Sequence, residues 1–324
     1  MSSLANLVVV RQLKNRAKPV AIAARAVFRA ARGHRYWSAF EAARAAEIEA
    51  AARRLHQTLF DPELESPIKT LDLPLAGARG ARAGFKPLAD FLLIACQNQQ
   101  GAPAKLSESA DDPDGDATLA VLNKAVALAE RLTGNDRGSL GLHPAIYFYG
   151  PTGQHSAPMF LGTCRLLARK NLENDKLFWR RFTEVRAKLE AILVEHKGLI
   201  ADLLQKATSF QRVAVYEQLL AGLIAALVAG DAPDDAALVR LAGMEGKVVA
   251  GRQISSGKDI SDDTKSAVFI TTVLAREPQC AVCGGYLPRR SFSYDHRVPR
   301  RDGGTGDLAN VQLTHPYCNQ SYKA

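Results

Sequence analysis

The chain has 324 residues, 47% of them hydrophobic, and carries a formal net charge of +9. This length is sufficient for two or three domains with cores of their own. The best candidate for a membrane span, residues 219–228, is too short to cross a bilayer. Residues 1–10 lack the basic region and cleavage site of a secretory signal, so we expect a cytoplasmic protein with no membrane partner.

The positive charge is concentrated in residues 1–60, which hold eleven Lys and Arg residues against three Glu. A basic segment of this kind attracts polyanions, nucleic acid first. A solvated helix face that keeps the protein soluble has the same composition. Charge alone therefore leaves both interpretations open.

Helices are predicted for most of residues 1–60, because AIAARAVFRAARG and FEAARAAEIEAAARRLHQTLF are rich in strong helix formers. Residues 61–85 are rich in Pro and Gly and contain an extended stretch, IKTLDLPL. A short helix at 87–97 and a polar loop at 98–117 follow. The acidic cluster in this loop lacks the distal Glu of a calcium-binding loop, so we expect no calcium site there.

A further helix is predicted at residues 118–132, and the run AIYFY at 145–149 predicts a short β strand because turn residues flank it. His143 and His155 lie on either side of this run. Two histidines near a glycine turn can form a site, but they are more often turn or packing residues.

The clearest helical pattern covers residues 174–207, where apolar residues recur at alternating spacings of four and three from Phe178 to Leu203. This is the coiled-coil-like spacing that packs helices side by side. Such a seam could support a homodimer, although packing within the chain is its more common use.

Two more helices are predicted at residues 213–229 and 264–276, on either side of a loop-rich stretch at 230–262. We place a domain boundary in this stretch. The predicted organisation is a basic helical segment at 1–60, a helical domain with a short β-type insertion at 61–245, and a linker helix with a small domain at 246–324, whose core is 280–323.

Three of the five cysteines fall within the last 45 residues, which favours a metal site over a disulfide framework and suits a reducing compartment. Cys280 and Cys283 form a C-x-x-C pair followed by two glycines, and His315 and Cys318 form an H-x-x-C pair. Two tight pairs of sulfur and nitrogen ligands match a tetrahedral structural zinc site. His315 is the weakest of the four, because it could lie nearby without binding metal.

A second pattern is interleaved with these cysteines. Asp295-His296 is followed by Pro299, Gly303-Gly304, Asn310 and Cys318-Asn319, where Asn310 stands 15 positions after Asp295 and Asn319 stands 9 positions after Asn310. An isolated Asp-His pair is ordinarily a surface ion pair. In this order and spacing, inside a zinc knuckle, the segment 280–323 resembles the HNH endonuclease family, the zinc-ribbon branch of the ββα-metal nucleases.

The resemblance implies two short strands, near 292–296 and 311–313, and a helix that starts near Pro316. The predicted fold is therefore mainly α, with helical N-terminal and middle regions followed by a small C-terminal ββα-metal zinc-ribbon domain. The family name refers to a final His, whereas this chain has Asn319 at that place. An Asn still offers an oxygen to a hard divalent ion.

The resemblance also implies roles for the polar residues. A neutral imidazole can take a proton near pH 7, so His296 is the predicted general base. Asp295 and Asn319 are predicted to bind the catalytic Mg²⁺ or Mn²⁺, and Asn310 to brace the loop that orients His296. Five arginines are expected to contact phosphates of the DNA, namely Arg289, Arg290, Arg297, Arg300 and Arg301.

The predicted function is metal-dependent cleavage of DNA, with RNA not excluded as a substrate. One alternative is a zinc-ribbon module that binds nucleic acid without cutting it. Another is an interaction subunit of a defence complex. A weaker resemblance, carried by PIKTLDLPLAG, SLGLHPAIYFYGPTGQHSAPMF and the segment DGGTGDLANVQLTHPYCN, is to the C-terminal part of bacterial GmrSD-like restriction-type HNH proteins, and it implies a role in bacterial defence.

Overall fold

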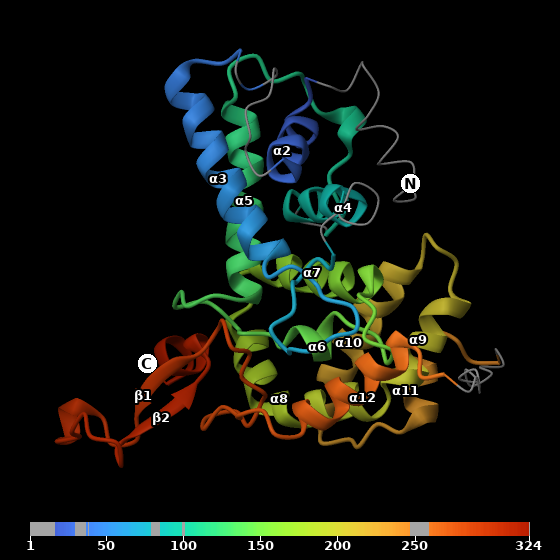
Figure 1. Cartoon of the computed structure of the whole chain (residues 1–324), viewed down its shortest axis with the longest axis vertical. Coiled ribbons are helices and arrows are strands. Elements are labelled where there is room, and N and C mark those ends of the chain that lie inside the picture. Colours follow the sequence, from blue (N-terminus) through green and yellow to red (C-terminus); the bar gives the residue numbers. More distant parts are fainter. Residues whose placement is uncertain are drawn as a thin grey trace.

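The computed structural model of the chain describes residues 17–29, 37, 39–78, 85–98, 101–246 and 259–323. Most of these residues form helices, as predicted (Figure 1). In chain order the helices are α2 (Pro19–Phe28), α3 (Ala42–Phe60), α4 (Phe85–Ala95), α5 (Asp116–Leu132), α6 (Pro144–Tyr147), α7 (Ala157–Leu172), α8 (Lys176–Glu195), α9 (Lys197–Lys206), α10 (Arg212–Ala229), α11 (Asp235–Leu241) and α12 (Asp262–Leu274). The remaining elements are η2 (Leu106–Glu108), β1 (Ser293–His296), η3 (Arg300–Asp302), β2 (Val311–Thr314) and η4 (Cys318–Tyr322).

The helices form one body, in which α2, α3, α4 and α5 lie at one end and α7 to α12 at the other (Figure 1). Local sequence explains several helix starts. Pro19 occupies the first turn of α2, where no hydrogen bond from its nitrogen is required. Before α5, the buried carboxylate of Asp112 accepts hydrogen bonds from the backbone nitrogens of Gly115 and Thr118, at 3.0 and 2.7 Å.

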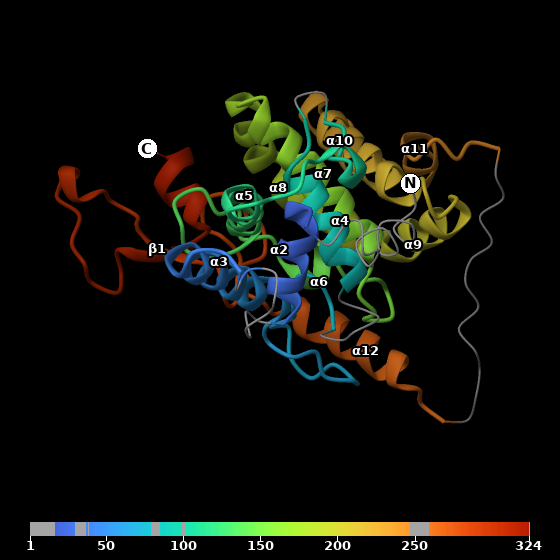
Figure 2. The same cartoon turned by 90° about the horizontal axis from the view of Figure 1, so that it is seen from above.

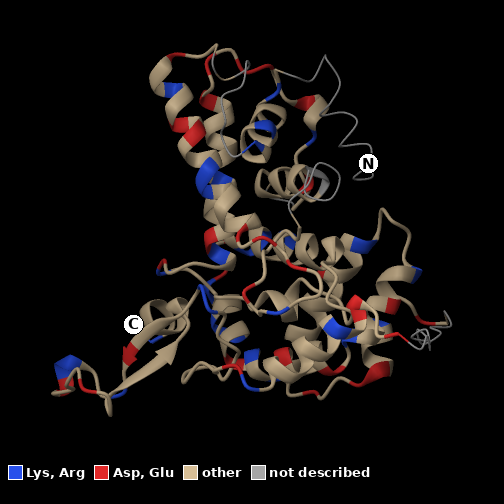
Figure 3. Cartoon of the chain, in the orientation of Figure 1, with Lys and Arg blue, Asp and Glu red and all other residues tan. Residues whose placement is uncertain are grey.

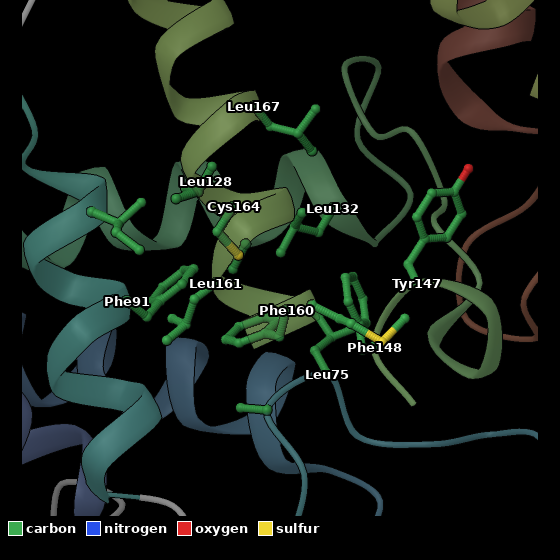
Figure 4. Packing of buried hydrophobic residues seen from close by; sticks show 14 of the residues in the cluster. Leu75, Phe91, Leu128, Leu132, Tyr147, Phe148, Phe160, Leu161, Cys164 and Leu167 are labelled. Atoms are coloured by element: carbon green, nitrogen blue, oxygen red, sulfur yellow. The ribbon is translucent and has the colours of Figure 1, made fainter. Parts of the chain in front are cut away.

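The hydrophobic core is continuous between the two ends of this body. Phe160 of α7 stacks on Phe91 of α4 at 5.6 Å and meets Phe148 edge-on at 5.4 Å (Figure 4). Buried residues of α2 and α3 belong to the same hydrophobic cluster as those of α8 and α10. The predicted division of the helical region at residue 60 remains an interpretation of the sequence.

Three of the basic residues among the first 60 form ion pairs with acidic residues. Lys18 binds Asp111 at 3.0 Å, and Arg44 binds Asp116 at 2.7 Å. Arg54 forms an ion pair with Glu130. These contacts favour the interpretation of this part as a solvated helix face. Most of the other basic residues of the segment lie outside the described residues.

The β strand predicted at 145–149 is wrong. Pro144 occupies the first turn of α6, and residues 145–147 complete this helical turn. The run is apolar because all of its residues are fully buried, so its composition reflects burial on every side and not the two-sided pattern of a strand. A single antiparallel bridge between Tyr149 and His155 is the β-type contact of this region.

The helix predicted at 174–207 is divided in two at His196, which ends α8 and precedes α9. Its apolar seam packs within the chain, since α8 contacts α6 and α10. Helix α10 has the length and apolar composition that could cross a membrane. One or two such helices are weak evidence, because core helices have the same composition, and α10 packs closely against α7 and α8.

The last 45 residues form a small domain on the side of the body opposite to α11 (Figures 1 and 2). Strands β1 and β2 pair antiparallel, with Asp295 opposite Gln312 and His296 opposite Val311. These strands lie within one residue of the predicted ones at each end. The loop between them extends away from the body, and the basic residues of η3 lie near its tip (Figure 3).

Candidate metal centre and nuclease site

The four predicted zinc ligands meet at one point of the small domain. The sulfur atoms of Cys280, Cys283 and Cys318 and a ring nitrogen of His315 all lie within 4.8 Å of one another. Zn–S bonds of 2.3 Å in a tetrahedron require ligand atoms about 3.8 Å apart, so the four atoms suit a zinc ion. His315, the weakest of the four predictions, faces this cluster with Nδ1, which lies 3.4 Å from Cys283 Sγ.

Without a metal ion, one cysteine of the cluster carries the negative charge, because hydrogen bonds to Cys280 raise the pKa of the Cys283 and Cys318 thiols. Hydrogen bonds from Cys283 and Cys318 hold the pKa of the Cys280 thiol well below its ordinary value. Burial lowers the pKa of His315, so its imidazole is neutral near pH 7. Thiolates and a neutral imidazole are the forms in which these side chains bind zinc.

The backbone wraps closely around the first cysteine pair. Gly284 has a φ of +70°, which places it in the left-handed region that glycine adopts readily. The backbone nitrogen of Gly284 donates to the Cys280 carbonyl, and that of Cys280 donates to the Gly285 carbonyl, each at 2.8 Å. These are the two glycines that follow the C-x-x-C pair in the sequence.

The helical body supports the zinc ligands from outside. His315 Nε2 donates to the carbonyl of Tyr286 at 3.0 Å, and the nitrogen of Tyr286 donates to Glu190 Oε2 of α8 at 2.7 Å. Glu190 forms a buried ion pair with Arg186 at 2.7 Å, and both side chains are almost completely buried. Burial of this outer group fixes the orientation of His315.

A second group of polar residues lies next to the zinc cluster. A pocket of about 300 Å³ is lined by the predicted catalytic residues and their neighbours, namely Asp295, His296, Pro299, Arg300, Arg301, Asn319 and Lys323. Three of the four predicted catalytic residues thus share one pocket. Asn310 is not among the residues that line it.

Asp295 is the buried member of β1, with 9% of its surface exposed. Its Oδ2 accepts hydrogen bonds from Gln312 Nε2 at 3.0 Å and from Lys323 Nζ at 2.6 Å. The carboxylate is therefore held in place by a neighbour on β2 and by a cation. Nothing in the local sequence pattern points to Gln312 or Lys323 as a partner of Asp295.

Asn319 lies in η4, directly after Cys318 of the metal cluster, and lines the same pocket as Asp295. Its nitrogen Nδ2 donates to Ser293 Oγ at 2.7 Å and to the Tyr294 carbonyl at 3.0 Å. Because the nitrogen is used in this way, the amide oxygen is the atom that Asn319 can offer to a cation. A carboxylate and an amide oxygen form a hard donor set, which suits Mg²⁺ or Mn²⁺.

Asn310 holds both ends of the loop between the strands. Its Oδ1 accepts from the nitrogen of Val298 at 2.8 Å, and its Nδ2 donates to the carbonyls of Val298 and Thr305, at 3.1 and 2.7 Å. Gly304 allows this closure, because a Cβ there would lie 1.7 Å from the Val298 oxygen. This geometry is the one expected of a residue that braces the loop next to His296.

His296 ends β1 at the mouth of the pocket, and its Nε2 accepts a hydrogen bond from Arg300 Nε at 3.3 Å. Arg301 is largely exposed, with 83% of its side-chain surface accessible. Arg289 and Arg297 are exposed as well. Arg290 is engaged elsewhere, because its guanidinium binds Asp72 at 2.8 Å and the Asp61 carbonyl at 2.9 Å.

A protein-family model matches one part of the chain. The family model described as HNH endonuclease matches residues 280–324, which are the zinc cluster, the two strands and the pocket. An HNH endonuclease domain therefore occupies this segment, and its family implies a nuclease that binds nucleic acid. Comparison with the curated proteins and with the solved structures gives no match.

Proposed function

We propose that the domain at residues 280–323 is an endonuclease that hydrolyses phosphodiester bonds of DNA with the help of a divalent cation. The observation that supports this most directly is the shared pocket of Asp295, His296 and Asn319 next to the zinc cluster. These side chains come from β1 and η4, and the antiparallel pairing of β1 with β2 fixes the position of the first two.

His296 acts as the general base in this proposal. It lies at the mouth of the pocket, where its imidazole can accept a proton from the attacking water. In the resting structure Arg300 donates to Nε2 of His296. Binding of a phosphate next to Arg300 would draw the guanidinium away and free this nitrogen for the proton.

Asp295 and Asn319 hold the divalent cation through one carboxylate and one amide oxygen. When bound, the cation supplies positive charge to the phosphate and to the leaving 3′ oxygen. Asn310 keeps the loop closed, so that the backbone that follows His296 does not move when substrate binds.

The exposed arginines of the small domain bind the DNA backbone. Arg297, Arg300 and Arg301 flank the pocket on the loop that extends from the body, and Arg289 is exposed on the segment before β1. We assign Arg290 to the contact between the small domain and the helical body, because its guanidinium already binds Asp72. We make no proposal on a defence role, since the family match does not extend to the two upstream segments that carry the weaker resemblance.

The test is a supercoiled-plasmid assay with the zinc-loaded protein, with Mg²⁺, with Mn²⁺ and with neither ion. We expect nicked or linear plasmid with the wild-type protein and a divalent ion, and intact plasmid with His296→Ala. His196→Ala is the matched control, since His196 lies on another element and pairs with Asp235. Cleavage by His296→Ala at the wild-type rate would refute the proposed base.

A non-catalytic module gives a different pattern. It binds the plasmid in a mobility-shift assay whether or not His296 is present, and added divalent ions change nothing. A single-stranded RNA of matched length, tested in parallel, decides between DNA and RNA as the substrate.

A further inference from the structure

We infer that Lys323 is an internal counter-ion of the nuclease pocket, whose ammonium group neutralises Asp295 in the metal-free protein and is displaced when a divalent cation binds. The inference rests on the proposed function, because it takes Asp295 as a ligand of that cation. The central observation is the ion pair between Lys323 Nζ and Asp295 Oδ2, at 2.6 Å.

This pair differs from an ordinary surface ion pair in the burial of its acid. The side chain of Asp295 is 11% exposed, whereas that of Lys323 is 35% exposed. A carboxylate that has lost most of its water needs another positive or hydrogen-bonding partner. Gln312 donates one hydrogen bond to the same oxygen, but it carries no charge. Lys323 supplies the positive charge.

The zinc cluster determines where Lys323 lies. In η4 the backbone nitrogen of Lys323 donates to the carbonyl of the zinc ligand Cys318 at 3.3 Å, which closes a wide turn five residues long. Asn319 and Lys323 are four residues apart in this turn, so their side chains lie on one face and both line the pocket. Lys323 is therefore directed at Asp295 by a segment that the zinc ligands anchor.

The ammonium group of Lys323 occupies the carboxylate that the divalent cation would bind. Mg²⁺ binds a carboxylate oxygen at about 2.0–2.1 Å, so it cannot share Asp295 Oδ2 with an ammonium group at hydrogen-bond distance without strong repulsion. The lysine side chain has a flexible four-carbon stem, and its ammonium can leave Asp295 while the backbone stays in place. Lys323 thus lowers the affinity for the cation without blocking the site.

The test measures binding of Mn²⁺ to the zinc-loaded protein by the electron paramagnetic resonance signal of free Mn²⁺, without DNA. Lys323→Met removes the charge, and Lys323→Arg retains it. Lys265→Met is the matched control, because Lys265 forms an exposed ion pair with Asp262 at 3.0 Å on α12. Zinc content and circular dichroism show whether each variant is folded.

We expect Lys323→Met to bind Mn²⁺ about three- to tenfold more tightly than the wild type, a range set by the partial exposure of the pair. Lys323→Arg and Lys265→Met should bind it within about twofold of the wild type. Thermal unfolding gives a second measure. Without divalent ions Lys323→Met should be less stable than the wild type, and added Mg²⁺ should raise its Tm by more than it raises that of the wild type.

Asp295→Asn separates failure of this inference from failure of the proposed function. Loss of Mn²⁺ binding in Asp295→Asn, with unchanged or weaker binding in Lys323→Met, would refute the counter-ion and leave the metal site intact. Unchanged binding in Asp295→Asn would refute the metal site itself, and the counter-ion with it.

Discussion

Replacement of Glu190 by Gln should destabilise the whole protein and weaken the zinc site at the same time. Glu190 is fully buried on α8, and its carboxylate accepts three hydrogen bonds. Oε1 accepts from Arg186 Nε at 2.7 Å and from the Tyr147 hydroxyl at 3.1 Å, and Oε2 accepts from the Tyr286 nitrogen at 2.7 Å. Gln has one acceptor oxygen in place of two, so its amide nitrogen must face a donor.

The expected loss of stability follows from the positive charge of Arg186, which the substitution leaves without its charged partner. Arg186 is also buried, and its remaining hydrogen bonds go to the neutral carbonyls of Leu140 and Gly141. Loss of one member of a buried ion pair costs about 3–5 kcal/mol. Because a domain is stable by only about 5–15 kcal/mol, this is a large fraction of the free energy of unfolding. Zinc affinity should fall about 10- to 100-fold, as for other outer-shell partners of metal-binding histidines.

Urea unfolding of the zinc-loaded protein measures the first effect, and competition with a chromophoric zinc chelator measures the second. Glu184→Gln is the matched control on the same helix, because Glu184 forms an exposed pair with Arg180. Its change should stay below about 0.5 kcal/mol. A Glu190→Gln protein within about 1 kcal/mol of the wild type, well short of the expected loss, and with unchanged zinc affinity would refute the proposed support of the zinc site by α8.

Three further predictions concern the loop, the arginines and a buried histidine. Asn310→Ala removes the side-chain hydrogen bonds that close the loop, so plasmid cleavage should slow by at least about tenfold, while the Tm of the protein falls by only a few degrees. Arg301→Ala should reduce the salt dependence of DNA binding by about one phosphate contact, whereas Arg290→Ala should lower stability and leave the salt dependence unchanged, as mobility-shift titrations over a range of salt would show. Burial lowers the pKa of His143 to about 3, so the unfolded chain binds a proton below about pH 6.5 that the folded protein does not. Stability should therefore fall from pH 6.5 to 5 by about 2 kcal/mol more in the wild type than in His143→Gln, measured by urea unfolding at each pH.

The metal centre was predictable because its chemistry depends on residue type and spacing along the chain. Two close ligand pairs with glycines after the first are sufficient to predict a four-ligand site, and His315 joins the cysteines as expected. The same holds for the two strands, which the resemblance placed to within one residue at each end. Helices with a clear apolar stripe, such as α5, were predictable for the same local reason.

Features that depend on tertiary burial were not predictable. Arg186 and Glu190 are four residues apart on a helix, a spacing that is typical of an exposed ion pair. The packing of α6, of the segment before it and of the zinc knuckle over this face buries them. Arg290 directly follows Arg289, which is exposed, and nothing in the local sequence distinguishes the two arginines. The partner of Arg290, Asp72, lies 218 residues away.

The size of the small domain explains why it needs the helical body. Its own buried cluster consists of Cys280, Leu287 and Cys318, two of which belong to the candidate zinc site. So small a core cannot by itself offset the entropy of ordering about 45 residues. Domains of this size usually gain the missing stability from a structural metal. Here the helical body adds a second source of stability, through the buried carboxylate of Glu190 and the Arg290–Asp72 pair. Because the turn that holds Cys318 also carries Asn319, these supports determine the position of the pocket as well as the stability of the domain.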